Sequence, residues 1–245
     1  MSLPKLNTAL HTLVLPSTGE EISFRPFLVR EEKILMMAME SGETKDMINS
    51  LRQIIDSCVE SKLDVKHLPM FDIEYIFLQL RARSVGEEIE VSFQLPTEDS
   101  CEKMEDKNCQ YKTKVKVDDI NVERDESHTD LISLTDDIKV KMKYPRVEDT
   151  MHLAGIEGKE LVNKTFSMIG DSMEYIMEGE EIHQTKDSTQ KEREDFVQSL
   201  SSGQFREIQE FFNTMPKVKK EVTGKCERCG KENTTVLEGM ASFFA

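Results

Sequence analysis

The sequence predicts an α+β fold, in which helices and antiparallel strands occupy separate stretches of the chain. In residues 47–58 the apolar side chains recur at the spacing of one helix face. In residues 88–93 and 112–117 they alternate strictly with charged ones, which is typical of strands with one solvated face. We therefore expect a helical N-terminal region (1–95), an antiparallel sheet in the middle (96–145), and a helical C-terminal region (146–245) that ends in a small ribbon-like Cys-x-x-Cys hairpin.

The N-terminal region is expected to begin with a β-hairpin. Residues 12–15 and 22–25 flank the turn Pro16-Ser17-Thr18-Gly19, where Pro fixes one φ angle and Gly supplies a positive one. Pro26 ends the second strand. Helices are predicted over residues 29–40, 47–58 and 71–83. In the first helix the expected inward side chains are Ile34, Leu35, Met37 and Ala38; in the second they are Met47, Ile48, Leu51, Ile54, Ile55 and Cys58; in the third they are Ile73, Ile76, Phe77 and Leu80. Tyr75 and Leu78 widen the apolar surface of the third helix, so we expect it to be buried between other elements.

In the middle and C-terminal regions the pattern switches between strands and helices. The strands 88–93, 112–117 and 138–144 are expected to form one antiparallel sheet, with Cys101 and Cys109 on a polar loop between the first two. Helices are predicted over residues 161–176, 191–200 and 203–214, with a short strand or an exposed loop at 178–188. Residues 217–222 and 234–237 are strand-like and flank a Cys-Gly turn.

Composition narrows the class of protein. The net charge of −15 over 245 residues repels phosphate backbones, so we expect no nucleic-acid partner. A local basic patch at Lys217, Lys219, Lys220 and Lys225 is more typical of a solvated strand face. No apolar run approaches the roughly 20 residues needed to span a bilayer, and the N-terminus lacks a signal-peptide pattern. We expect a protein made and kept in a cytoplasm.

Catalytic motifs give no support to an enzyme. The five histidines form no HxxxH, HExxH or HxH pattern, and no serine lies in a Gly-x-Ser-x-Gly elbow. No GxGxxG or Walker-type loop occurs, and glycines are scattered. We therefore predict a non-enzymatic protein.

The cysteines suggest a metal site as one of two alternatives. Cys226-x-x-Cys229-Gly230 has the form of a zinc knuckle, which supplies two thiolates of the four ligands that structural zinc needs. Cys101 and Cys109 are the other pair that could complete a four-cysteine site. The alternative is that these are reduced surface thiols. Cys58 is expected in the core.

Methionines and the C-terminal tail offer docking surfaces as an alternative to core packing. Met36, Met37 and Met39 cluster on one predicted helix, and Met168, Met173 and Met177 on another. Methionine fills cores, but it also repacks readily against partners. The tail Met240-Ala-Ser-Phe-Phe either folds onto the protein's own core or anchors a partner.

Several motifs together resemble the baseplate hub subunit and hub assembly protein family of T-even-like contractile-tailed bacteriophages. The resemblance covers residues 1–95 densely and the last 25 clearly, whereas the middle matches only in layout. The matching motifs are Leu15-Pro16-Ser17-Thr18-Gly19, Phe24-Arg25-Pro26-Phe27-Leu28-Val29-Arg30-Glu31-Glu32-Lys33-Ile34-Leu35, Asp56-Ser57-Cys58, Leu63-Asp64-Val65, residues 68–87, the terminal Cys-x-x-Cys, and Leu237-Glu238-Gly239-Met240-x-x-Phe243-Phe244.

This resemblance implies a non-enzymatic protein that acts in assembly of the central tail baseplate through contacts with other phage hub or tail proteins. The expected location is the host cytoplasm during assembly, or the virion baseplate. A transient hub-assembly chaperone, absent from the mature particle, is one alternative; a zinc-ribbon adaptor or regulator unrelated to virions is another. Arg25 and Arg30, within the signature, are the first candidates for partner contacts.

Overall fold

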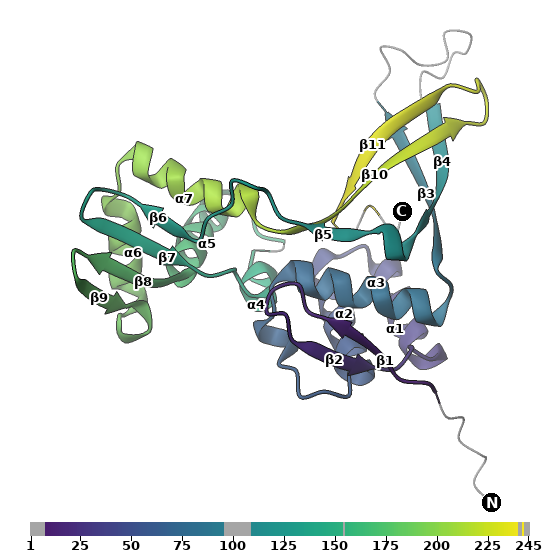
Figure 1. Cartoon of the computed structure of the whole chain (residues 1–245), viewed down its shortest axis with the longest axis horizontal. Coiled ribbons are helices and arrows are strands. Elements are labelled where there is room, and N and C mark those ends of the chain that lie inside the picture. Colours follow the sequence, from purple (N-terminus) through teal and green to yellow (C-terminus); the bar gives the residue numbers. More distant parts are fainter. Residues whose placement is uncertain (1–7, 96–108, 154, 240–241, 243–245) are drawn as a thin grey trace, which may run out of the picture.

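The computed structural model describes residues 8–95, 109–153, 155–239 and 242, and it shows a mixed α+β protein with antiparallel sheets, as predicted. Figure 1 shows two parts joined by extended chain. One part holds the first three helices and a long twisted sheet that projects from them. The other holds a four-stranded sheet covered by helices. The division of the sequence at residues 95 and 145 stays a prediction.

The predicted N-terminal hairpin and three helices are confirmed. Strands β1 (His11–Val14) and β2 (Glu21–Phe24) pair antiparallel, with His11 opposite Phe24. Helices α1 (Val29–Ser41), α2 (Thr44–Cys58) and α3 (Met70–Ser84) follow, and a short 3-10 helix, η1 (Val65–His67), precedes α3. The turn between β1 and β2 closes at Gly19, where φ is +72°.

The first hydrophobic core lies between this hairpin and the three helices. All five of the predicted inward positions of α2 from Ile48 to Cys58 are buried, as are the four predicted in α3. Val147 joins this core from α4 (Val147–Met151), and its N–H donates to Leu68 O (2.8 Å). The first core therefore includes a residue that is distant in sequence from the N-terminal hairpin and helices.

Helix α3 is buried on two faces. Ile76 and Phe77 pack into the first core, whereas Leu78 and Ala82 pack into a second core beneath the long sheet. Tyr75 contacts both cores. The expectation that the extra apolar surface of this helix is covered by other elements is thus confirmed.

The prediction for α1 was wrong at one position. Ala38 is buried and Ile34 and Leu35 are half-buried, but Met37 is 65 % exposed. The inward position near the start of the helix is taken by Glu31, a buried carboxylate. Positions 31, 34, 35 and 38 have the spacing of one helix face, and Met37 lies outside that face.

The long sheet joins the middle of the chain to its C-terminal hairpin. Its strand order is β11 (Glu232–Glu238), β10 (Lys217–Cys226), β4 (Cys109–Lys116), β3 (Glu88–Leu95), and β5 (Asn121–Glu123) also pairs with β10. All neighbours are antiparallel. Between β4 and β5 lies a 3-10 helix, η2 (Val117–Asp119).

This sheet corrects the placement of one cysteine. Cys109 was expected on a loop, but it is the first residue of β4 and pairs with Leu95. Strand β4 begins before the alternating segment 112–117 because β3 pairs with it along its whole length, from Glu88 opposite Lys116 to Leu95 opposite Cys109. Cys101 lies outside the described residues.

A glycine allows two aromatic rings to cover the sheet near its tip. Phe93 and Tyr111 are paired across β3 and β4, with ring centroids 5.2 Å apart and planes 14° apart. A Cβ on Gly224 would lie 2.8 Å from the ring of Phe93. Because only glycine leaves room there, the rings can cover the backbone of β10.

The second sheet corrects two further predictions. Its order is β6 (Leu131–Ser133), β7 (Ile138–Met142), β8 (Met173–Glu178), β9 (Glu181–Gln184), so β7 is not in the same sheet as β3 and β4. The helix expected over residues 161–176 ends at Asp171. Met173 and Ile176 have helical spacing, but pairing with β7 makes this segment a strand.

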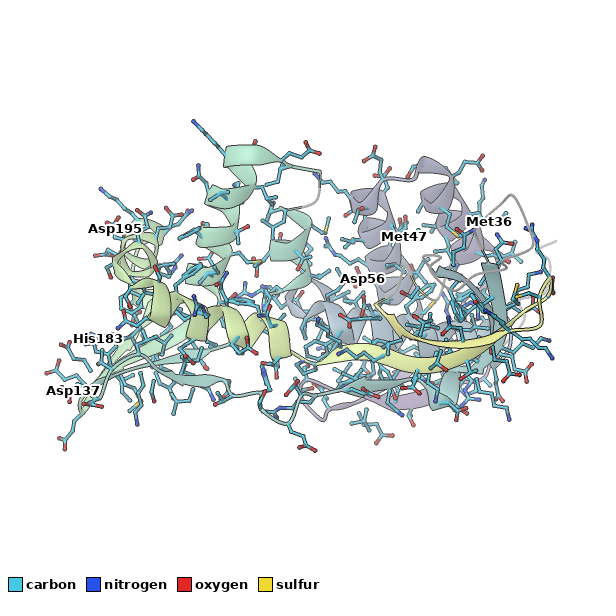
Figure 2. All side chains as sticks on the ribbon, turned by 90° about the horizontal axis from the view of Figure 1, so that it is seen from above. Met36, Met47, Asp56, Asp137, His183 and Asp195 are labelled. Carbon is cyan, nitrogen blue, oxygen red and sulfur yellow. The ribbon has the colours of Figure 1, made fainter. Side chains whose placement is uncertain are left out.

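Four C-terminal elements complete this part. They are α5 (Gly158–Asp171), η3 (Thr185–Asp187), α6 (Gln190–Ser199) and α7 (Ser202–Thr214). Thr189 and Ser201 cap α6 and α7, and each side-chain oxygen accepts from a backbone N–H of the first turn. The predicted helices at 191–200 and 203–214 are confirmed within two residues. In Figure 2, the labelled Asp137 and His183 lie at the end of the molecule far from α1 and α2.

The two parts meet at an aromatic contact. Phe71 of α3 meets the ring of Tyr144 edge to face, with centroids 5.1 Å apart. On its other side Tyr144 stacks with Phe211 of α7 and with His128. His128 is buried, and its Nδ1 lies 2.9 Å from Thr214 Oγ1. The start of α3 is thereby tied to the C-terminal part.

A buried carboxylate ties the same helix to the N-terminal hairpin. Asp72, in the first turn of α3, is fully buried, and its Oδ1 accepts from the backbone N–H of Ser17 (3.1 Å). The Ser17 hydroxyl donates to its other oxygen. Burial raises the pKa of Asp72 to about 6, although both hydrogen bonds from Ser17 favour the charged form.

We expect Leu78→Ala to lower the free energy of unfolding by about 2–5 kcal/mol, because it opens a cavity between α3 and the long sheet. Val85→Ala, at a 64 % exposed position just after the helix, is the matched control and should stay within about 0.5 kcal/mol of the parent. Urea unfolding measures both. Equal effects of the two changes would contradict the double burial of α3.

We expect the stability contribution of Asp72 to fall as the pH rises. Its pKa in the folded protein, about 6, lies above the ordinary value of 3.8, so the folded state binds more protons between these values. Raising the pH from 4 to 7 should therefore destabilise the parent relative to Asp72→Asn, by an amount on the order of 2 kcal/mol.

Urea unfolding of both proteins across this pH range tests the expectation. Asp46→Asn provides the control, because Asp46 occupies the equivalent position of α2 and is exposed. A pH profile of Asp72→Asn parallel to that of the parent would show that Asp72 does not titrate in this range.

Candidate functional site

Arg25, the first candidate for partner contacts, is held inside the protein. Its side chain is 12 % exposed. Nη2 donates to Glu31 Oε1 (2.9 Å) and to the backbone oxygen of Ser57 (2.7 Å), and Nη1 donates to Pro26 O (3.0 Å). The guanidinium thus joins the end of β2 to the start of α1 and the end of α2.

Arg30 occupies the opposite environment. Its side chain is 68 % exposed, and its Nε donates to the same Oε1 of Glu31 (2.6 Å). The rest of its guanidinium faces solvent at the start of α1. Of the two arginines, Arg30 therefore has the surface that a partner could reach.

Glu31 is the centre of this arrangement. It is the third residue of α1, and its Oε2 accepts from the Leu28 N–H (2.8 Å), one of the donors that a helix start leaves without an intrahelical partner. Burial alone would raise the pKa of Glu31, but the hydrogen bonds from Arg25, Leu28 and Arg30 outweigh it and lower the pKa to about 2. The network keeps the carboxylate charged and fixes the hairpin to α1. A role of Arg25 and Arg30 in partner binding stays a prediction.

The structure places the two C-terminal cysteines on either side of a turn. Cys226 ends β10, is 1 % exposed, and packs against Tyr111. Cys229 is exposed in the turn to β11. The Gly230 N–H donates to Cys226 O (2.8 Å), and the Cys226 N–H donates to Lys231 O (2.9 Å).

Zinc binding by Cys101, Cys109, Cys226 and Cys229 stays a prediction. Cys101 lies outside the described residues, as does the side chain of Cys109. Within the described part of the chain, no group of three or more His, Cys, Asp or Glu side chains is placed to hold a metal ion.

Two of the lysines on β10 take part in ion pairs. Lys217 Nζ lies 2.7 Å from Glu238 Oε1, and Lys219 Nζ lies 3.6 Å from Glu238 Oε2. These contacts lie on the face of the long sheet and join β10 to β11. They fit the expected solvated strand face.

The two methionine groups differ in exposure. Met173 is fully buried in the third core, and Met168 and Met177 are half-buried. On α1, by contrast, the exposed apolar side chains gather on the outer side, as Figure 2 shows for Met36. We call this set the methionine face: Val29 (79 % exposed), Met36 (64 %), Met37 (65 %) and Met39 (47 %). Sequence reasoning found the cluster but assigned Met37 to the core.

No helix in residues 8–95, 109–153 or 155–239 has the length and apolar character needed to cross a membrane.

We expect Arg25→Ala to destabilise the fold by about 3–5 kcal/mol, because it leaves the buried Glu31 carboxylate without its buried partner. Arg30→Ala removes an exposed ion pair of the same carboxylate and should cost less than about 1 kcal/mol. Urea unfolding at pH 7 gives both values. Equal losses for the two variants would contradict the structural role assigned to Arg25.

Comparisons with known proteins agree with this picture. A family model described as "T4 bacteriophage base plate protein" matches residues 8–245. The chain is 24 % identical over 223 residues to the "Baseplate hub assembly protein gp26" of Enterobacteria phage T4, covering 91 % of this chain and 92 % of that protein. The comparison with solved structures gives no significant match. Because the family model spans both parts of the molecule, the chain belongs to the family of T4 bacteriophage base plate proteins.

Proposed function

We propose that this chain is a non-enzymatic protein that acts in assembly of the central baseplate hub of a contractile tail through protein–protein contacts. Its membership of the base plate protein family and its likeness to a hub assembly protein over 91 % of its length support the proposal. Its partners are other hub or tail proteins of the phage, and its place of action is the host cell during tail assembly.

The observation that carries this proposal is the methionine face of α1. Four apolar side chains are about half or more exposed on one helix, whereas Ile34 and Leu35 of the same helix pack against the first core. Large exposed apolar patches on soluble proteins mark binding surfaces, and flexible methionine side chains adapt to a partner's shape.

Charged neighbours give this face a polar rim. Glu32 and Glu40 of α1 and Glu43, which follows it, are exposed, and Arg30 lies at the start of the helix. An apolar centre with a charged rim is the usual anatomy of a protein interface. A partner surface with apolar side chains and basic neighbours would complement it.

The proposal covers a subunit retained in the particle and, as the alternative, a chaperone that leaves before maturation. Mass spectrometry of purified particles separates the two. The other alternative, a zinc-ribbon adaptor or regulator unrelated to virions, has less support, because the matching family and the relative are both phage baseplate proteins.

We expect Met36→Glu and Met37→Glu to block hub assembly without unfolding the protein. Both side chains are more than half exposed, so the folding free energy should change by less than about 0.5 kcal/mol. Placing a carboxylate in the centre of an apolar contact should weaken the partner interaction by about 2 kcal/mol or more.

The measurement is the yield of infectious particles when each variant replaces the parent chain, with thermal unfolding to verify the fold. Ile182→Glu is the matched control, since Ile182 is 55 % exposed on β9, in the other part of the molecule. Parental yields with both methionine variants would overturn the assignment of this face.

A further inference from the structure

An apolar groove runs beside α3 and has no part in the proposal above. One end lies between the α1–α2 turn and α3 and has a volume of about 490 Å³. The other end, about 280 Å³, extends towards the contact between the two parts at Tyr144 and Met215. Both ends share Met70, Glu74, Thr150, Glu238 and Gly239, so they form one continuous groove.

The groove is built to receive apolar side chains. Its floor includes Ile48 and Leu51, which are buried residues of the first core, and Met47 and Met70 line it as half-buried side chains. Its volume is in the range of pockets that hold ligands of several side chains in size. Figure 2 labels Met47 on the side of the helical layer near α1.

The C-terminal end of β11 opens directly into this groove. Glu238 and Gly239 line it, and the Gly239 N–H donates to Val218 O (3.1 Å). At Gly239 φ is +70°, so the chain turns away from the direction of the strand. A Cβ added at Gly239 would lie 3.5 Å from Glu74 Oε1, so this turn of the chain lies directly beside α3.

Ser242 is hydrogen-bonded to the end of β11. Its N–H donates to Gly239 O (3.3 Å), and its hydroxyl donates to Glu238 O (2.8 Å). The residues that follow, Phe243-Phe244-Ala245, are apolar and lie outside the described part of the chain. Because Gly239 lines the groove and each residue can extend the chain by up to about 3.5 Å, a segment of this length is long enough to reach the groove's floor.

We propose that this groove is the docking site of the chain's own residues 240–245, with the rings of Phe243 and Phe244 packed against Met47, Leu51 and Met70. Three features select this occupant: the groove is apolar, the tail is apolar, and the tail emerges from the groove's own wall at Gly239. A tethered segment has an effective concentration in the millimolar range, which a free peptide from a partner must exceed.

The test compares the full chain with a variant that ends at Gly239. A synthetic peptide of sequence Met-Ala-Ser-Phe-Phe-Ala, labelled with a fluorophore, is titrated into each protein. We expect the shortened chain to bind it at least about tenfold more tightly than the full chain, in which the tethered tail competes. Met47→Glu in the shortened chain should weaken this binding.

A full-length variant guards against misfolding of the shortened chain. Phe243→Asp with Phe244→Asp should lower the melting temperature by roughly 5 °C and make the groove available to the peptide, whereas Ala245→Asp adds charge to the same tail and should do neither. Equal peptide binding by the full and shortened chains would overturn the proposal in favour of a partner's segment. Absence of binding to either, with unchanged melting temperatures, would overturn it outright.

Discussion

Helix α3 is buried from two sides, and the rest of the structure depends on this constraint. One face carries Ile76 and Phe77 into the helical core, and the other carries Leu78 and Ala82 into the core of the long sheet. Its first turn also holds the hairpin through Asp72 and the C-terminal part through Phe71. A helix in this position cannot shift without opening both cores, since each is closely packed.

Two buried carboxylates connect the opening hairpin to this framework in different ways. Glu31 is surrounded by donors from Arg25, Arg30 and a backbone N–H, and it stays ionised. Asp72 accepts two hydrogen bonds from Ser17, and its pKa rises to about 6 because these bonds do not fully replace water around a buried carboxylate. Of the two arginines in the opening signature, Arg25 is thus structural and Arg30 presents its charge to solvent.

Surface features separate from this scaffold suit a protein that works through contacts. The methionine face lies on α1, and the apolar groove lies between the end of α1, helices α2 and α3, and the end of β11. Their apolar side chains differ, but Glu43 belongs both to the charged rim of the methionine face and to the lining of the groove. The long sheet projects beyond both, with Phe93 and Tyr111 covering its tip above Gly224.

The sequence by itself determined the local elements whose periodicity is strong. Helix α2 followed from the spacing of Ile48, Leu51 and Ile55, and the β3 and β4 pair from strict alternation, because side-chain periods of 3.6 and 2 follow directly from backbone geometry. The signature motifs also pointed to the family. Only the tertiary structure decided that Met173 and Ile176 lie in a strand, that Cys109 begins a strand, and that Met37 is exposed. The two strand outcomes depend on neighbours distant in sequence, namely β7 and β3, and Met37 is exposed because the inward face of α1 runs through Glu31, Ile34, Leu35 and Ala38. A local pattern carries no information about which surfaces will cover it.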